Sequence, residues 1–237
     1  MGAFRELLKQ MVPKAVRKAV WKYLEYPELF RFAVMQRWLD FQIDDMPWLD
    51  EDSRASFLPL LENSRYYMEY GSGGSTVLAA KLNKSFISVD TDKYFLKAVR
   101  SKIGMLGPHQ RLLHGNIGWT TLYGYPVFKI PSARRQKRWK AYIESPWRSI
   151  ESGLLPDLVM VDGRFRVAVA LTSGVHLMNA PESRIVVDDY TDRPFYHEIE
   201  AYARLVEIAG RKAIFQPQST CSPAILAAID QYSRDWR

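Results

Sequence analysis

From residue 66 onward, short runs rich in valine, isoleucine and aromatic residues alternate with longer runs of helical pattern. Strand patterns cover residues 66–70, 85–90, 111–117, 156–162, 183–189 and 212–218, and helical patterns cover 75–82, 91–103, 166–178 and 194–210. Strands that alternate with helices in this way form a mostly parallel sheet with helices on both faces. We therefore predict a doubly wound α/β domain, in which ligands bind beyond the carboxyl ends of the strands. The end of the chain, SPAILAAIDQYSRDWR, has a helical pattern, so we assign no seventh strand.

In front of this α/β domain, at 56–237, we predict a helical segment at 1–55. Within residues 1–24, apolar residues recur at three- and four-residue spacing, which marks one face of a helix. The basic residues between them are Arg5, Lys9, Lys14, Arg17, Lys18 and Lys22, opposed only by Glu6. Such a helix can pack on its own domain, or it can make peripheral contact with an anionic membrane surface or a partner. Both interpretations stay open.

Composition limits the class of protein. Hydrophobic residues make up 47% and charged residues 25%, and no apolar run approaches the ~18 residues of a membrane span. The single cysteine, Cys221, excludes an internal disulfide and fits a reducing compartment. The start MGAFRELLKQ lacks the apolar core of a signal peptide. We expect a cytoplasmic protein, with the inner membrane surface as the place of any peripheral contact, and its net charge of +7 favours anionic partners.

Polar residues follow five consecutive predicted strands. They are Glu69, Asp90, Asn116, Asp162 and the pair Asp188 and Asp189. Each alone could be a helix cap or a turn residue, since Asp and Asn are common there for local reasons. Because the carboxyl ends of parallel strands share one edge of the sheet, the whole set predicts a binding rim.

The loop EYGSGGST at 69–76 joins the first strand to the next helix. Its glycines permit positive backbone dihedrals and close approach of a ligand, and the N–H groups near Ser75 favour a carboxylate-bearing one. The loop lacks the Gly-Lys pair of a phosphate-binding loop, and Thr76 stands at the third glycine of the G-x-G-x-x-G dinucleotide fingerprint. We therefore interpret it as a ligand loop of another kind.

Glu69 before this loop and Asp90 at the end of the next strand complete a pattern that resembles the class I S-adenosylmethionine-dependent methyltransferases. The resemblance covers residues 66–216 and implies a Rossmann-like fold with S-adenosylmethionine as cofactor. It implies that Glu69 helps to anchor the cofactor's amino group and that Asp90 accepts both ribose hydroxyls. The other matched positions are Gly71, Ser72, Gly73 and Ser75 beside the methionine part and Asn116 and Ile117 beside adenine.

The fourth strand, in LVMVDGRFRVAVAL, resembles a version found in bacterial members of that family, in which Asp162 faces the transferred methyl group. Methyl transfer needs in-line geometry and a base for the acceptor. His197, in the first turn after the fifth strand, is a second candidate for that base. The alternative for His197 is an ordinary solvent-facing side chain.

Asp162, Asp188 and Asp189 could together hold a hard cation such as Mg²⁺. The arrangement resembles the catechol-type O-methyltransferases, although an Asp-Asp pair replaces their Asp-Asn pair and their lysine is missing. The alternative is that Asp189 caps the next helix while Arg164 or Arg166 pairs with Asp188 or with an anionic substrate.

Residues 119–150 form an insertion rich in aromatic residues and cations, starting at a strand's carboxyl end. Its cations are Lys129, Arg134, Arg135, Lys137, Arg138 and Lys140. Such a segment can bind an acidic acceptor, or it can be a solvated helix face. The fourth strand lacks the Asn/Asp-Pro-Pro-aromatic signature of enzymes that methylate exocyclic amines, which argues against a nucleic-acid substrate and for a small-molecule or glycan-type hydroxyl.

The first hypothesis is thus an S-adenosylmethionine-dependent O-methyltransferase. A nicotinamide-dependent oxidoreductase on a similar sheet is a second, against which stand Thr76 and the absence of an evident Tyr-x-x-x-Lys pair. A third is a non-catalytic Rossmann-like protein that docks through its basic N-terminal helix.

Overall fold

The structure is a computed structural model that describes residues 32, 34, 41–150, 154–218 and 221–237. The chain divides into two compact units, Met1–Phe41 and Gln42–Arg237. The basic amphipathic pattern of residues 1–24, and with it the suggested membrane contact, lies outside the described residues. The boundary predicted at residue 55 falls inside helix α4, Glu51–Asn63, which belongs to the second unit. Among the residues described, none of the helices combines the length and apolar character that crossing a bilayer requires.

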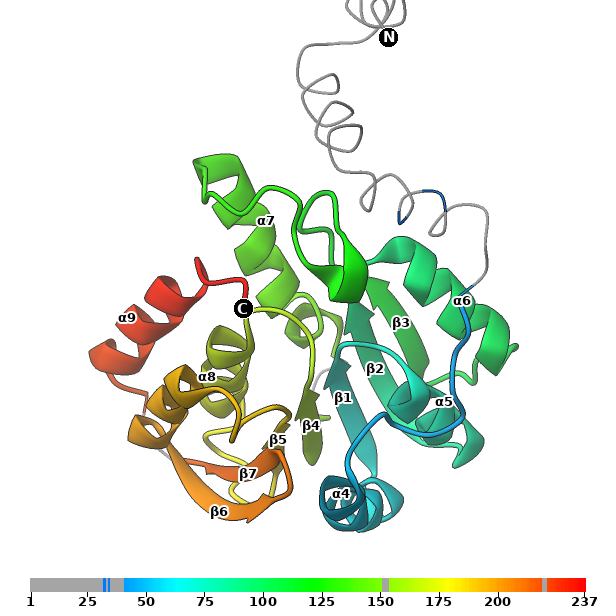
Figure 1. The fold of residues 1–237 in the computed structure, drawn as a ribbon. Coiled ribbons are helices and arrows are strands. Elements are labelled where there is room, and N and C mark those ends of the chain that lie inside the picture. The colour runs from blue at the N-terminus through cyan, green and yellow to red at the C-terminus, as the bar shows by residue number, and fades with distance from the viewer. Residues whose placement is uncertain (1–31, 33, 35–40, 151–153, 219–220) are drawn as a thin grey trace, which may run out of the picture. The chain divides into compact units, whose positions relative to one another are not determined.

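The second unit is built on one seven-stranded sheet in the order β3-β2-β1-β4-β5-β7-β6 (Figure 1). The strands are β1 Tyr66–Tyr70, β2 Ser85–Asp90, β3 Gln110–His114, β4 Leu158–Val161, β5 Arg184–Val187, β6 Ala203–Ala209 and β7 Lys212–Pro217. The first five run parallel, while β7 is antiparallel to both β5 and β6. This confirms the predicted doubly wound, mostly parallel sheet.

Helices cover both faces of the sheet. Besides α4 they are α5 Gly74–Lys81, α6 Lys93–Ile103, α7 Ala133–Glu144, α8 Arg166–His176 and α9 Pro223–Tyr232, with 3-10 turns η1 Leu122–Gly124, η2 Trp147–Ser149 and η3 Pro194–Ala201. Because alternate side chains of a strand point to opposite faces, β1 contributes to two separate cores. Tyr67 packs with Phe57 of α4, and Tyr70 packs edge-on against Tyr142 of α7. The first core holds α4, α5 and α6, and the second holds α7, α8 and α9.

The helix predicted at 194–210 is wrong beyond residue 201. After η3 the chain forms strand β6, a two-residue turn at Gly210 and Arg211, and then β7. Strand β6 lies at the sheet edge and exposes Val206 and Ile208. Its sequence therefore lacks the continuous apolar run that is typical of the buried central strands. The seventh strand is therefore this one, and the end of the chain is helical, as its pattern indicated.

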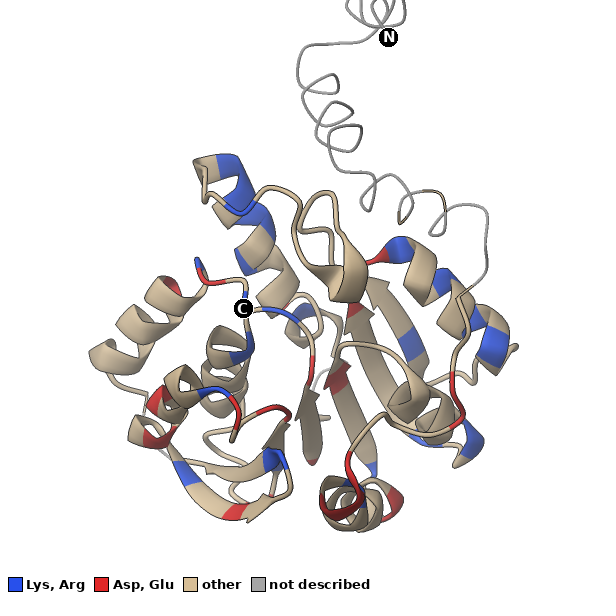
Figure 2. Ribbon diagram, viewed as in Figure 1, with Lys and Arg blue, Asp and Glu red and all other residues tan. Residues whose placement is uncertain are grey.

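The insertion at 119–150 contains a short bridge between Thr120 and Pro126 and then helix α7. On α7, Trp139 and Tyr142 are buried against the sheet, and the outer face carries lysines and arginines (Figure 2). The segment is thus part of the core on one side and a basic surface on the other.

Candidate functional site

The glycine loop after β1 is held against the end of β4. Gly71 has a φ of +98°, and a Cβ there would lie 2.8 Å from the backbone carbonyl of Asp162. A Cβ on Gly74 would collide with the main chain of Met46, whereas one on Gly73 would meet nothing within 4 Å. Gly71 and Gly74 are therefore required by packing, and Gly73 borders open space that a ligand could use.

Glu69 lies buried beneath this loop and accepts four hydroxyl hydrogen bonds. Its Oε1 accepts from Tyr67 at 3.0 Å and from Ser75, and its Oε2 accepts from Thr76 and from Ser88, the latter at 2.8 Å. Burial raises the pKa of Glu69 above its usual value, and the hydroxyls oppose this rise. Since a carboxylate has about four acceptor positions, the predicted contact with a cofactor amino group would require one hydroxyl to give way.

Asp90, at the end of β2, is held by two backbone donors. Its Oδ1 accepts the N–H of Asp92 at 2.7 Å and its Oδ2 accepts the N–H of Ser72 at 3.1 Å. Burial raises the pKa of Asp90 to about 7, against the opposing effect of these bonds and of Arg164. Each oxygen keeps a lone pair for a further donor, which suits the predicted ribose contact.

The segment after β3 adjoins this carboxylate. The backbone N–H of Gly115 donates to the carbonyl of Asp90 at 2.8 Å, which joins the two strand ends. Asn116 is exposed, and its side-chain oxygen accepts the N–H of Gly118 at 3.0 Å. Ile117 is buried, and its carbonyl accepts the indole N–H of Trp139 at 3.2 Å. The predicted cofactor residues of β1, β2 and β3 thus follow three adjacent strands.

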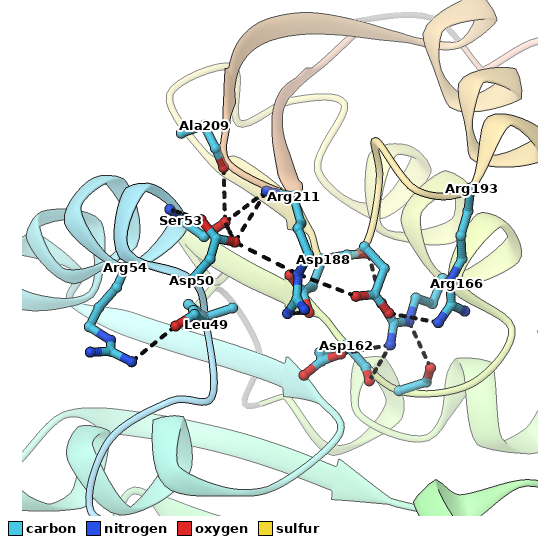
Figure 3. Close-up of polar contacts among 12 residues, drawn as sticks. Leu49, Asp50, Ser53, Arg54, Asp162, Arg166, Asp188, Arg193, Ala209 and Arg211 are labelled. Carbon is cyan, nitrogen blue, oxygen red and sulfur yellow. Dashed lines mark hydrogen bonds and ion pairs between the residues drawn. The ribbon is translucent and has the colours of Figure 1, made fainter.

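The acids after β4 and β5 are surrounded by arginines (Figure 3). Arg166 lies 2.7 Å from Oδ1 of Asp162 and 3.1 Å from Oδ2 of Asp189. It also donates to the carbonyl oxygens of Gly163, Asp162 and Asp188. Because it is only 3% exposed, its guanidinium is a buried junction between the two strand ends.

Two further arginines complete this cluster. Arg193 lies 2.7 Å from Asp189, and Arg211 reaches Asp188 at 3.6 Å. Within the described part of the chain, no group of three or more Asp, Glu, His or Cys side chains is placed to hold a metal ion. The structure therefore does not assemble the predicted Mg²⁺ site of Asp162, Asp188 and Asp189. The acids are paired with arginines, as the alternative proposed, but the partners differ from the predicted ones. Arg166 pairs with Asp162 and Asp189, and Arg211 is the arginine near Asp188. The residue that caps η3 is Arg193, so the predicted helix cap at Asp189 is wrong.

Burial also affects the protonation of these acids. It raises the pKa of Asp188 to about 7, with the neighbouring Asp162 adding to the rise and Arg166 opposing it. Burial likewise raises the pKa of Asp162, whose side chain is still 40% exposed. Asp162 is thus a reachable carboxylate beside the glycine loop, with a pKa displaced towards neutrality.

His197 lies elsewhere. It is an exposed residue of η3, and its ring packs on that of Tyr190 with the centroids 4.8 Å apart. Tyr190 itself is buried and donates its hydroxyl to Glu200. These contacts agree with the solvent-facing alternative for His197 and give no support to its role as a base.

Comparison with known proteins agrees with this arrangement. The chain is similar to a solved methyltransferase-like protein from Silicibacter pomeroyi DSS-3, at 28% identity and a TM-score of 0.66. The likeness covers 81% of this chain and 100% of that one. This likeness agrees with the resemblance to the class I methyltransferases that the sequence motifs indicate, and it supports a methyltransferase fold for the chain.

More distant methyltransferases have lower scores. An N-methyltransferase, NodS, from Bradyrhizobium japonicum WM9 was solved with S-adenosylhomocysteine; it has 14% identity and a TM-score of 0.39, over 73% of this chain and 93% of its own. A Podospora anserina methyltransferase, PaMTH1, also solved with S-adenosylhomocysteine, has 12% identity and a TM-score of 0.45, over 87% and 89%. These two scores are too low to carry an argument. No protein-family model and no curated protein matches the chain.

Beside the arginine cluster lies a pocket of about 340 Å³ that the sequence patterns did not predict. It is lined by Tyr125, Lys129, Arg193, Phe195, Trp236 and Arg237. The sequence indicated only a part of this pocket, because the cations of the insertion at 119–150 include Lys129. Trp236 and Arg237 are far from the other lining residues in sequence, and their place is fixed by hydrogen bonds from Phe165 and Arg166 to their carbonyls, at 3.5 and 3.4 Å.

Proposed function

We propose that the protein transfers the methyl group of S-adenosylmethionine to an oxygen of a small-molecule or glycan-type acceptor. The observation that carries this proposal is the pairing of an open position at Gly73 with the Asp90 carboxylate, at the ends of the adjacent strands β1 and β2. Asp90 retains lone pairs for two hydroxyl donors, as a ribose would supply. The acceptor oxygens of Asp90 and the open space at Gly73 therefore fit the cofactor.

When bound, S-adenosylmethionine supplies an electrophilic methyl group on a sulfonium. Among the protein's residues, we assign Asp162 to deprotonate or orient the acceptor hydroxyl. Its carboxylate is partly exposed and follows β4. The backbone of Asp162 lies directly against Gly71 of the cofactor loop. A pKa raised by burial makes a carboxylate a better base near neutral pH, and Arg166 fixes its position.

Calorimetry with S-adenosylhomocysteine, S-adenosylmethionine and NAD tests the cofactor. We expect the first two to bind and NAD not to bind. Asp90→Ala should weaken S-adenosylhomocysteine binding by about a hundredfold, because two hydrogen bonds to a charged group are lost at roughly 1.5 kcal/mol each. Asp192→Ala, an exposed acid after β5, is the matched control and should bind normally. Binding of NAD alone would refute the proposal.

Asp162→Asn tests the catalytic assignment. It removes the base and keeps the size of the side chain, so kcat for methylation of hydroxyl acceptors should fall about a hundredfold or more. Affinity for S-adenosylhomocysteine should stay within about twofold of the wild type, since Asp90 and the loop are intact. An unchanged kcat would show that Asp162 is not the base.

Chelation tests the metal hypothesis separately. Because Arg166, Arg193 and Arg211 already pair with the three acids, we expect methylation to continue undiminished in EDTA. Activity that disappears in EDTA and returns with Mg²⁺ would restore the metal site.

A further inference from the structure

Arg164, two residues after Asp162, is a buried cation with no acidic side chain within ion-pair distance, although its charge opposes the rise in the pKa of Asp90 and of Asp162. Its side chain belongs to a residue only 4% exposed, and its Nε and Nη1 atoms have no hydrogen-bond partner in the structure. Among the ion pairs of the described residues none involves Arg164, whereas Arg166 has two. A buried charge left unpaired is destabilising by several kcal/mol, so its retention calls for a ligand.

The guanidinium of Arg164 lies over the ring of Tyr125, 4.3 Å from its centroid. Tyr125 lines the 340 Å³ pocket and stands edge-on to Trp236 at 5.5 Å. Arg164 thus lies behind the part of the pocket wall that Tyr125 forms. Although burial opposes it, the charge of Arg164, followed by that of other arginines, lowers the pKa of Tyr125 below its ordinary value.

The cations that line the pocket differ in whether an acidic side chain neutralises their charge. Arg193 pairs with Asp189 at 2.7 Å, and Arg237 pairs with Asp235 at 2.6 Å. Lys129 instead lies 4.4 Å above the ring of Trp236. Aromatic faces attract cations but do not neutralise them. Lys129 in the lining, together with Arg164 behind Tyr125, therefore gives the pocket an excess of positive charge.

We propose that this pocket receives the methyl acceptor and that the acceptor is an anion, whose carboxylate or phosphate pairs with Arg164. A planar guanidinium with free N–H groups matches either anion through two parallel hydrogen bonds. Lys129 adds a second, more exposed charge, and the rings of Tyr125 and Trp236 supply apolar contact. The volume is in the range of small-molecule sites. This inference rests on the proposed function only in naming the ligand as the acceptor.

Binding of benzoate and of its neutral isostere benzamide, measured by calorimetry with and without saturating S-adenosylhomocysteine, tests the site. Benzoate should bind wild-type protein at least about tenfold more tightly than benzamide, and inorganic phosphate should compete with it. Arg164→Met should abolish this preference. Affinity for S-adenosylhomocysteine, measured near pH 9 so that Asp90 stays ionised without the charge of Arg164, should stay unchanged. Lys129→Met should reduce the preference by a smaller factor, and Lys137→Met, on the exposed face of α7, should leave it as it is.

The other outcomes separate the possible sources of the anion. If Arg164→Met weakens S-adenosylhomocysteine instead and spares the benzoate preference, the anion is the cofactor's own carboxylate and the proposal is wrong. Equal binding of benzoate and benzamide, or binding of neither, also refutes it. If benzoate binding depends on Arg164 but S-adenosylhomocysteine does not bind, the anion site stands and the proposed function fails. Should Arg164→Met not fold, Arg164→Lys, which keeps the charge and loses the paired donors, should reduce the preference.

Discussion

The carboxylates on the two halves of the sheet's carboxyl edge are stabilised by different partners. On the β1–β2 half, Glu69 and Asp90 accept hydrogen bonds from neutral hydroxyls and backbone N–H groups. On the β4–β5 half, Asp162, Asp188 and Asp189 each have an arginine within 4 Å. The same residue types at equivalent strand ends are therefore held by neutral donors on one half and by arginines on the other.

This difference bears on which ligand each half can accept. A carboxylate that is held by neutral donors keeps its charge available, which suits the hydroxyls and the positive sulfonium of the proposed cofactor. Carboxylates that are paired with arginines offer no such charge, and the unpaired Arg164 beside them favours an anion. Two reactants of opposite charge could thus bind side by side with little competition.

The largest expected effect of a substitution is at the centre of the β4–β5 half, which we call the arginine half. Arg166→Met leaves Asp162 and Asp189 without their shared partner and frees three carbonyl oxygens, so unfolding free energy should fall by about 3–5 kcal/mol. Arg193→Met breaks one ion pair, whose arginine is 25% exposed, and one hydrogen bond to the hydroxyl of Tyr196, and should lower the unfolding free energy by about 1–2 kcal/mol. Urea denaturation measures both, and equal values for the two variants would contradict the central role of Arg166.

On the other half, Glu69→Leu should lower the unfolding free energy by on the order of 3 kcal/mol, because four hydroxyls lose their common acceptor. Glu69→Gln keeps one oxygen acceptor, and rotation of the hydroxyls can satisfy the amide, so the loss should be about 1 kcal/mol. Glu62→Leu, at an exposed position of α4, is the control and should change stability by about 0.5 kcal/mol or less. A Glu69→Leu variant as stable as the wild type would show that the hydroxyls find partners without the carboxylate.

These two halves also differ in how far the sequence predicted them. The strand patterns at 66–70 and 85–90 coincide with β1 and β2, and Asp90 follows directly from the second pattern. Local periodicity is sufficient there because central parallel strands are buried along their whole length. The acids after β4 and β5 were also found, and Arg166 was named as a partner for Asp188, whereas its side chain pairs with Asp162 and Asp189.

Arg211 was missed because it comes from a distant part of the chain. Arg211 lies in the turn between β6 and β7, and the strand β6 itself was taken for helix because its outer side chains are exposed. The Gly210–Arg211 pair before the KAIFQP run is a two-residue hairpin signal that could have identified it. Trp236 enters the pocket through tertiary contacts, among them those with Tyr125 and Lys129, for which no local pattern exists.

A smaller effect is expected at Lys212, a cation of the arginine half that is buried with its amine unpartnered. Burial lowers its pKa to about 8 in the folded protein, against about 10.4 when unfolded. Between these values the unfolded chain binds more protons, so stability should rise with pH from about 8 to 10. Lys212→Met should remove this rise and stabilise the protein at pH 7 by about 2 kcal/mol. Thermal unfolding across this range measures it, with Lys97→Met as an exposed control; an equal rise in both variants would assign the titration to other groups.

The smallest expected effect is on the pH dependence of S-adenosylhomocysteine binding, which should depend on one half of the edge and not on the other. Asp90 and Asp188 both have a pKa raised to about 7 by burial, but only Asp90 is proposed to meet the ribose. Hydroxyl donors favour the ionised carboxylate, so S-adenosylhomocysteine affinity should increase by up to about tenfold per pH unit below 7 and level off above it. Asp90→Asn should bind weakly at all pH values and lose this dependence, whereas Asp188→Asn should retain it. If Asp188→Asn abolished the dependence and Asp90→Asn did not, the titrating group would lie on the arginine half, and the two halves would not act separately in binding.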